Sequence, residues 1–238
     1  MLDKRITTVL FDLDGTLLPM DEPLFVKTYF RELAKKGAEH GCTDSEKLTA
    51  AVWKGTAAMV KNDGTVKNDA RFWQVFTQEM NEEENRLRPV FDRFYAEEFN
   101  RVKDVVGKNP LAKQAVQGLK ERGYDVILAT NPLFPKVAVA TRLSWLGLTL
   151  EDFLEVTSYE EYSHCKPNPD YFREILRKTG KTPEECLMVG NDAEEDLAAG
   201  ELGMPVFLVT DCLINEKDRE IADVPQGSFE EFIRWLGL

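Results

Sequence analysis

The chain contains few cysteines and no long apolar run. Its four cysteines are spread along the sequence without a C-x-x-C pair: Cys42, Cys165, Cys186 and Cys212. This spacing indicates neither a disulfide framework nor a structural zinc site, and it favours a reducing compartment. No apolar stretch is long enough to cross a bilayer, and Asp12 and Asp14 interrupt the apolar run that begins at Ile6 before any signal-peptide cleavage site. We therefore expect a cytoplasmic protein that does not enter a membrane.

Positive charge is also in the minority. The 238 residues include 30 Lys and Arg against 42 Asp and Glu, which gives a formal net charge of -12. A surface with this balance repels the phosphate backbone of nucleic acids and anionic lipid headgroups, so neither is an expected partner. The hydrophobic fraction of 43% and the charged fraction of 30% are typical of folded soluble chains. They exclude a collagen-like, coiled-coil or wholly disordered protein.

The apolar pattern changes character twice along the chain. Residues 6–13 form an apolar, β-branched run of the kind that is buried on both faces of a parallel sheet. From residue 22 to about residue 103 the apolar positions follow a helical period, and we expect about four helices there. After residue 110, helices alternate with strands expected at 125–129, 155–156, 186–189 and 205–209, with further helices from about 194 and at 229–236.

This alternation predicts an α/β fold with a doubly wound, mostly parallel, Rossmann-like sheet. The first strand joins the later strands in one core domain, formed by residues 1–18 and 106–238. The helical block, residues 19–105, is then an all-helical domain inserted into that core.

Polar residues gather where the expected strands end, which is where ligands bind in a doubly wound sheet. Each group also has an ordinary structural interpretation, such as an Asp-Gly turn, an Asn-Pro turn, a solvated lysine or an acidic helix N-terminus. The groups are, in chain order, Asp12-Leu13-Asp14-Gly15-Thr16, Thr130-Asn131, Lys166, and Gly190-Asn191-Asp192 with Asp196. Their order and placement taken together favour a functional site over four unrelated loops.

In that order the motifs resemble those of the haloacid dehalogenase-like (HAD) hydrolase superfamily. Its members carry Asp-x-Asp-x-Thr after the first strand, Ser or Thr after the second, then a Lys and a final acidic pair. The helical insertion resembles the first cap type of that superfamily, found in its phosphoglycolate phosphatase-like and phosphoglucomutase-like branch. The resemblance extends over the whole chain, and it implies a HAD core with a helical cap at residues 19–105.

The resemblance implies a Mg²⁺-dependent phosphatase that hydrolyses a small phosphorylated metabolite through an aspartyl-phosphate. Asp12 would be the nucleophile and Asp14 the acid that protonates the leaving alcohol and then the base toward water. Lys166 would neutralise the phosphate. Phosphate binding is expected at Thr16, which also holds the turn, and at Thr130 and Asn131. Mg²⁺ is expected on three groups: the Asp12 side chain, the Asp14 backbone carbonyl and the Asp192 side chain.

One position departs from the pattern of many relatives, which have Asp directly after the Gly of the last motif. This chain has Asn191 there and Asp192 next, so either residue could face the metal. We favour Asp192, because Mg²⁺ prefers charged oxygen donors. Asp196 is then expected behind the ligands, where it would orient Lys166 or a metal-bound water.

The inserted domain offers several candidates for substrate contacts. They are the aromatic or polar residues near a predicted break between its helices: Trp53, Lys61, Asn62 and Arg71. The histidines, His40 and His164, are expected at the surface, because the chemistry needs no imidazole. Oligomeric state is not indicated by the sequence.

Four alternatives to a phosphatase remain at this stage. A phosphomutase would use the same motifs, whereas a dehalogenase fits less well because that branch generally replaces the residue corresponding to Asp14. A phosphonate hydrolase would need a Schiff-base lysine in the cap, such as Lys54 or Lys61. A non-catalytic binding module would keep the fold but not turn over phosphate esters.

Overall fold

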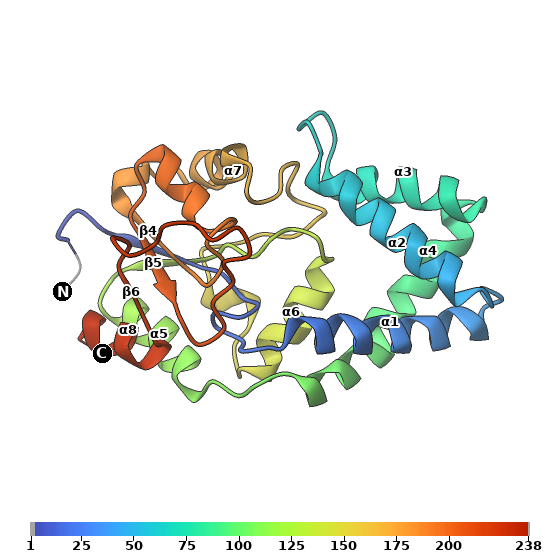
Figure 1. Cartoon of the computed structure of the whole chain (residues 1–238), viewed down its shortest axis with the longest axis horizontal. Helices are drawn as coiled ribbons and strands as arrows, with labels where there is room; N and C mark the ends of the chain where they lie inside the picture. Colours follow the sequence, from blue (N-terminus) through green and yellow to red (C-terminus); the bar gives the residue numbers. More distant parts are fainter. Residues whose placement is uncertain (1–2, 238) are drawn as a thin grey trace.

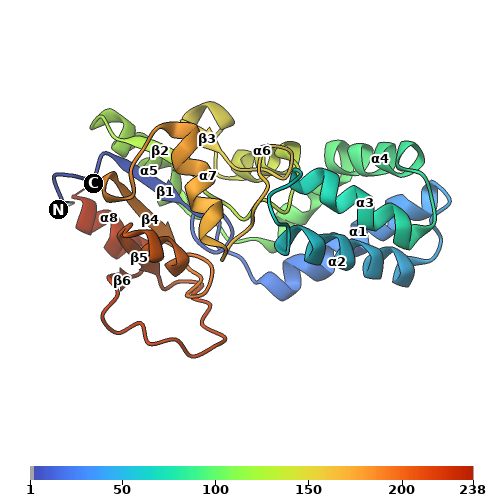
Figure 2. The same ribbon diagram turned by 90° about the horizontal axis from the view of Figure 1, so that it is seen from above.

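Six parallel strands form one sheet in the computed structural model, which describes residues 3–237. The strand order is β3-β2-β1-β4-β5-β6, and every neighbouring pair is parallel. The strands are β1 (Thr8–Phe11), β2 (Asp125–Leu128), β3 (Glu155–Val156), β4 (Cys186–Gly190), β5 (Val206–Val209) and β6 (Gln226–Gly227). This is the expected doubly wound α/β sheet (Figure 1), and β1 and β4 lie at its centre (Figure 2). All four residues of β1 and all five of β4 are buried, as the continuous apolar runs predict.

Helices cover both faces of the sheet. One face packs against α5 (Pro110–Glu121), α6 (Lys136–Trp145) and α8 (Phe229–Leu236), and the other against α7 (Pro169–Thr179) and a 3₁₀ segment, Leu197–Leu202. Alternation along β1 sends Val9 and Phe11 into the first layer and Leu10 into the second. Two short 3₁₀ turns, Leu150–Asp152 and Pro183–Glu185, complete the helical segments of this unit.

The segment expected to be a helix from residue 194 differs from the prediction. Turns precede the 3₁₀ segment that begins at Leu197, and no α-helix forms there in the described chain. Two aspartates hold this segment as turns. Asp192 Oδ1 accepts hydrogen bonds from the backbone N–H groups of Glu194 and Glu195. The Asp196 side chain points back toward the end of the strand and accepts from the Asp192 backbone N–H. The acidic run therefore forms a loop that places carboxylates at the end of β4.

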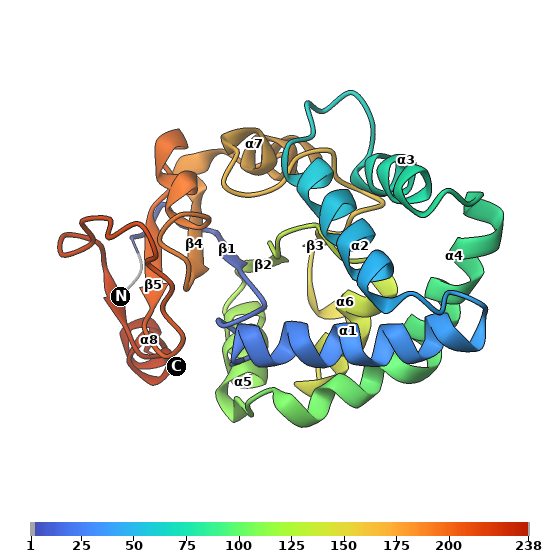
Figure 3. The same ribbon diagram turned by 45° about the vertical axis from the view of Figure 1, so that its right-hand side comes forward.

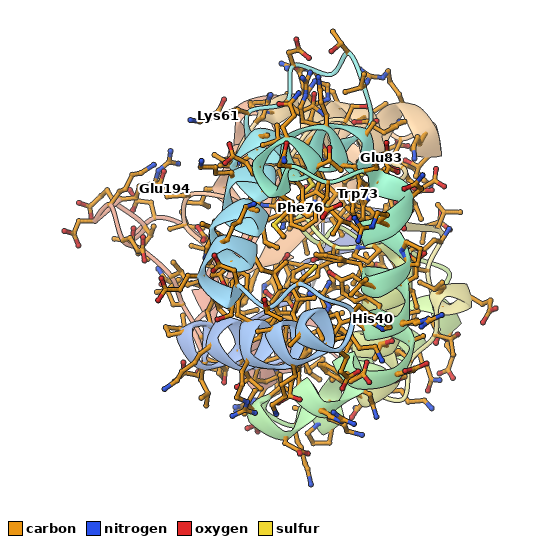
Figure 4. All side chains as sticks on the ribbon, turned by 90° about the vertical axis from the view of Figure 1, so that its right-hand side faces the viewer. His40, Lys61, Trp73, Phe76, Glu83 and Glu194 are labelled. Atoms are coloured by element: carbon orange, nitrogen blue, oxygen red, sulfur yellow. The ribbon has the colours of Figure 1, made fainter. Side chains whose placement is uncertain are left out.

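Between residues 22 and 105 the inserted segment forms helices joined by short loops. It contains α1 (Glu22–Glu39), α2 (Ser45–Val60), α3 (Asn68–Met80), α4 (Glu84–Arg93), a π-helical turn (Phe94–Glu98) and a 3₁₀ segment (Phe99–Val105). We call these residues the cap. Asp21 and Asp44 cap the N-termini of α1 and α2, and Trp73 and Phe76 point inward between the cap helices (Figure 4).

The cap packs against the core helix α6 and is also joined to the core by backbone hydrogen bonds. The two segments that link the cap to the core meet at an isolated bridge between Met20 and Val106. Beside this bridge, Gly107 N–H donates to the Pro19 carbonyl at 2.7 Å. At the start of α3, Asn68 N–H donates to the Tyr162 carbonyl at 2.8 Å. Figures 2 and 3 show the cap beside the carboxyl ends of the strands, with α1 and α2 extending away from the sheet. No helix within residues 3–237 has the length and apolar character needed to span a membrane.

Candidate active site

Asp12 lies directly after β1, at the centre of the sheet. Its backbone N–H donates to the Val189 carbonyl of β4 at 2.9 Å, which fixes the end of the strand. The side chain is 7% exposed and lines a cavity between core and cap. Its Oδ1 accepts a hydrogen bond from Lys166 Nζ at 2.9 Å. One carboxylate oxygen is thus held from behind, and the cavity lies on the other side.

Lys166 is completely buried and joins two aspartates. Its Nζ also donates to Asp196 Oδ1 at 2.6 Å, while Asp196 Oδ2 accepts from the Asp192 backbone N–H at 3.0 Å. Burial lowers the pKa of Lys166, but the charges of Asp12 and Asp196 outweigh it and hold the pKa well above its ordinary value. These two aspartates therefore favour the charged form of the ammonium.

The site carries more negative than positive charge. Burial raises the pKa of Asp12 to about 7, opposed by Lys166 and assisted by the charges of Asp196 and Asp14. Burial likewise raises the pKa of Glu195 to about 8 and raises that of Asp192. Burial is the largest cause of all three shifts, and the positive charge of Lys166 lowers each pKa without offsetting that burial.

This charge pattern fits a divalent cation. The surplus carboxylates are hard oxygen donors of the type that Mg²⁺ binds. Among residues 3–237, no three His, Cys, Asp or Glu side chains converge as a ready-made metal cage. A cation here would take few carboxylates and complete its shell with backbone carbonyl, phosphate and water oxygens, which is the usual mode of Mg²⁺.

Asp14 is paired with an arginine of the core. Arg142 is fully buried on α6, its Nη1 donates to Asp14 Oδ2, and its guanidinium carbon lies 4.5 Å from the centre of the Phe134 ring. Asp14 Oδ1 is buried and has no hydrogen-bond partner in the structure. Arg142 therefore anchors one oxygen of Asp14 and leaves the other free beside the cavity.

The Asn191 side chain is occupied at both ends. Its Oδ1 accepts from Thr16 Oγ1 at 2.8 Å, and its Nδ2 donates to the Cys212 carbonyl at 2.8 Å. Thr16 is buried and does not line the cavity, so its hydroxyl serves to hold the turn after β1. Gly15 has φ +85°, and a Cβ there would collide with Asn191, so this turn requires glycine.

Thr130 and Asn131 follow β2 and both line the cavity beside Asp12. The Asn131 side chain is committed to the protein, since its Nδ2 donates to Glu195 Oε1 at 2.8 Å and its Oδ1 accepts from the Lys166 backbone N–H at 3.2 Å. The Thr130 carbonyl accepts from the Tyr171 hydroxyl at 2.9 Å. These bonds make the strand end rigid and leave the Thr130 hydroxyl and backbone groups for a ligand.

Of the four cap candidates, only Trp53 lines the cavity. Lys61 projects outward at the end of α2 (Figure 4), and Arg71 pairs with Asp63 at the surface. Asn62 is buried, but its Nδ2 donates to Asn68 Oδ1 and to a backbone carbonyl. The break between helices at 61–67 contacts the core instead, where Lys67 Nζ donates to the Glu161 carbonyl at 2.8 Å, and its residues do not line the cavity.

Sequence reasoning missed two residues of the site, Arg142 and Glu195. Arg142 falls on the buried face of α6 together with Ala138 and Val139, and a lone arginine on an apolar helix face was the available signal. Glu195 lies in the acidic run between Asp192 and Asp196, which in sequence is typical of a helix N-terminus, whereas in the structure its half-buried side chain bonds Asn131.

Similar proteins are found by both sequence and structure. Residues 6–203 match the model of the family described as haloacid dehalogenase-like hydrolase. The chain is 25% identical over 203 residues to the pyrophosphatase PpaX of Bacillus velezensis, covering 85% of this chain and 82% of that protein. It is 25% identical over 211 residues to the phosphoglycolate phosphatase of Vibrio parahaemolyticus, covering 88% and 86% respectively.

A solved structure shares the fold over nearly the full length. The crystal structure of a HAD phosphatase from Thermococcus onnurineus superposes with a TM-score of 0.61 at 20% identity, covering 98% of both chains.

Proposed function

This chain belongs to the haloacid dehalogenase-like hydrolase family, and from that premise we propose that it is a Mg²⁺-dependent phosphatase acting on a small phosphate monoester. The proposal names Asp12 as the nucleophile. The observation that carries it is the placement of Asp12, with one oxygen fixed by a buried ammonium and a cavity in front of the carboxylate. The names of the similar phosphatases support the same reaction type.

In the first step, an Asp12 oxygen forms a bond to phosphorus while the ester P–O bond breaks. The leaving oxygen takes a proton from Asp14, which becomes a carboxylate. In the second step, water attacks the phosphorus, Asp14 accepts a proton from that water, and the P–O bond to Asp12 breaks to release phosphate. Each residue is thereby restored to its starting state.

The remaining residues hold charge in place during these steps. Lys166 compensates negative charge on the nucleophile side, and Asp196 fixes its position. Mg²⁺, when bound by Asp12, Asp192 and the Asp14 carbonyl, would supply Lewis-acid stabilisation of the phosphoryl oxygens. Thr130 and the Asn131 backbone are proposed to hold phosphate oxygens, because they line the cavity beside Asp12.

The cap boundaries predicted at 18/19 and 105/106 belong to the same proposal. The Met20–Val106 bridge supports them, since both connections cross between cap and core at that point. A small-molecule substrate is proposed on the same basis as the reaction, because the chemistry requires no macromolecular partner. The proposal of a cytoplasmic location rests instead on the cysteine spacing of the sequence.

Replacing the nucleophile tests the proposal. We expect Asp12→Asn to abolish phosphate release and to prevent modification by beryllofluoride, because an amide is too weak a nucleophile to form the intermediate. Asp92→Asn is the matched control, since Asp92 is exposed on α4 and does not line the cavity. Turnover by Asp12→Asn at the wild-type rate would disprove the covalent mechanism.

A further inference from the structure

The cavity in front of Asp12 is large and mainly aromatic on its cap side. It has a volume of about 1150 Å³, enough for a molecule much larger than phosphate. Nine aromatic side chains from the described residues line it, including Tyr29, Phe30 and Trp53 of the cap and Phe134 of the core. Trp53 is 50% exposed, and its ring lies 5.5 Å from that of Phe30. An exposed tryptophan beside a second ring at a cavity wall is a surface for an apolar or aromatic group.

The same cavity contains no free positive charge. Among its lining residues in the described chain there is no Lys, Arg or His. The two cations closest to the chemistry, Lys166 and Arg142, lie behind the cavity wall, and both are paired with aspartates. A second anionic group on a substrate would therefore lose its water without gaining a charged partner.

The charged residues that do line the cavity are acidic. Besides the site carboxylates, they include Asp21, Glu22, Asp104 and Glu216. Burial raises the pKa of Glu22, and the charges of Asp192, Asp14 and Glu216 raise it further. Because these carboxylates already repel one another, an anionic leaving group would meet further repulsion at this wall.

Hydrogen-bonding capacity on the aromatic side is also small. The hydroxyl groups of Tyr29 and Tyr95 lie 2.9 Å apart and bond each other, which leaves them one proton to donate to a ligand. A sugar or nucleotide base with many polar groups would leave several of them unpaired. The wall is thus suited to an uncharged ring with little polar functionality.

We propose that the alcohol released by this enzyme is an uncharged aromatic alcohol, whose ring lies against Trp53 and Phe30 while its phosphate faces Asp12. The inference rests on the proposed phosphatase function and specifies its substrate class. Monoesters whose leaving group carries a carboxylate or a second phosphate are poor substrates, although similar proteins bear names referring to such compounds.

A substrate panel tests this specificity. We expect kcat/KM for 2-naphthylmethyl phosphate to exceed that for phosphoglycolate, pyrophosphate and glucose 6-phosphate by about 100-fold, because apolar contact is gained in one case and charged or polar groups are buried unpaired in the others. Acetyl phosphate, a small activated phosphate, reports the Asp12 chemistry without a ring. Hydrolysis of acetyl phosphate together with a preference for phosphoglycolate or pyrophosphate would overturn this inference alone. Hydrolysis of none of these compounds would overturn the proposed phosphatase function.

A matched pair of tryptophan variants locates the ring. Trp53→Ala should raise KM for 2-naphthylmethyl phosphate by about 10-fold relative to its effect with acetyl phosphate, because only the aromatic substrate contacts the indole. Trp235→Ala is the control, since Trp235 lies on α8, is 36% exposed and does not line the cavity. Equal changes in KM for both substrates with Trp53→Ala would remove Trp53 from the binding surface.

Discussion

The two aspartates that share the Lys166 ammonium should respond in opposite ways to the same substitution. Asp196 uses both carboxylate oxygens as acceptors, one from Lys166 Nζ and one from the Asp192 backbone N–H. In Asp196→Asn, either orientation of the amide places its NH₂ group against one of these donors. Asp12 uses Oδ1 for Lys166 and borders the cavity, so Asp12→Asn can direct its oxygen to the ammonium and its NH₂ group to water.

These geometries set the expected magnitudes. Asp196→Asn should lower the free energy of unfolding by about 3 kcal/mol. This value is at the lower end of the range for breaking a buried ion pair, because Asp12 still pairs with Lys166. For Asp12, the pKa rises from 3.8 to about 7 on folding. Each pKa unit corresponds to about 1.4 kcal/mol, so the ionised Asp12 carboxylate opposes folding by at most about 4 kcal/mol. Asp12→Asn should therefore stabilise the metal-free protein by about 1–4 kcal/mol at pH 8.

The sign of the pH dependence follows from the same pKa. Between the unfolded value of 3.8 and the folded value of about 7, the folded protein binds more protons than the unfolded chain. The wild-type free energy of unfolding therefore falls as the pH rises through this interval, because Asp12 must ionise in its buried position. Asp12→Asn lacks that loss, so its stability advantage should increase from pH 5 to pH 7 and then level off.

Urea unfolding followed by tryptophan fluorescence, in EDTA at pH 5 to 8, measures both effects. Asp92→Asn serves as the control for replacing an exposed aspartate and should change the free energy of unfolding by less than about 0.5 kcal/mol. The reasoning would be refuted if Asp12→Asn destabilised the protein at pH 8 as strongly as Asp196→Asn. It would also be refuted if the difference between Asp12→Asn and wild type did not change with pH.

Two further predictions concern the acid and the metal. Asp14→Asn should slow hydrolysis of an alkyl phosphate by about 100-fold or more and the pre-steady-state burst from p-nitrophenyl phosphate much less, because only the alkoxide needs a proton; equal losses would exclude Asp14 as the acid. Asp192→Ala should weaken Mg²⁺ activation more than Asn191→Ala does, because the cation prefers a carboxylate and the Asn191 amide is already bonded at both ends. A magnesium titration with the reverse ranking would assign the ligand to Asn191.

Buried strands were the part of the fold most readable from the sequence. The predicted strands at 125–129, 186–189 and 205–209 correspond to β2, β4 and β5, because a parallel strand covered on both faces is a continuous apolar run. The edge strand β6 has no such run, and its two residues pair with β5 only because the folded chain brings them there. Local sequence carries no signal for that kind of strand.

Side-chain pairing across the fold was beyond the reach of sequence spacing. The motif order predicts that Asp12, Lys166 and Asp196 lie together at the carboxyl ends of the strands. It does not predict which oxygen bonds which nitrogen, because the three residues come from separate segments. Arg142 is 128 residues from its partner Asp14, and no motif links the two positions. Lys61 precedes a predicted break between helices, yet this break contacts the core and does not line the cavity.

Asp14, anchored by Arg142, and Trp53 are proposed to act on different parts of one substrate. Arg142 belongs to the core helix α6 and rests on the Phe134 ring, which in turn packs against Phe25 and Tyr29 of cap helix α1. With Oδ2 bonded to the guanidinium, Oδ1 is the oxygen left to carry a proton to the leaving group. Trp53, by contrast, lies on α2 and contacts only the group being released in the proposed arrangement. The rate lost on replacing Asp14 should therefore increase with the basicity of the leaving oxygen. The rise in KM on replacing Trp53 should instead increase with the size of the substrate's ring, because the two side chains act on different parts of one substrate.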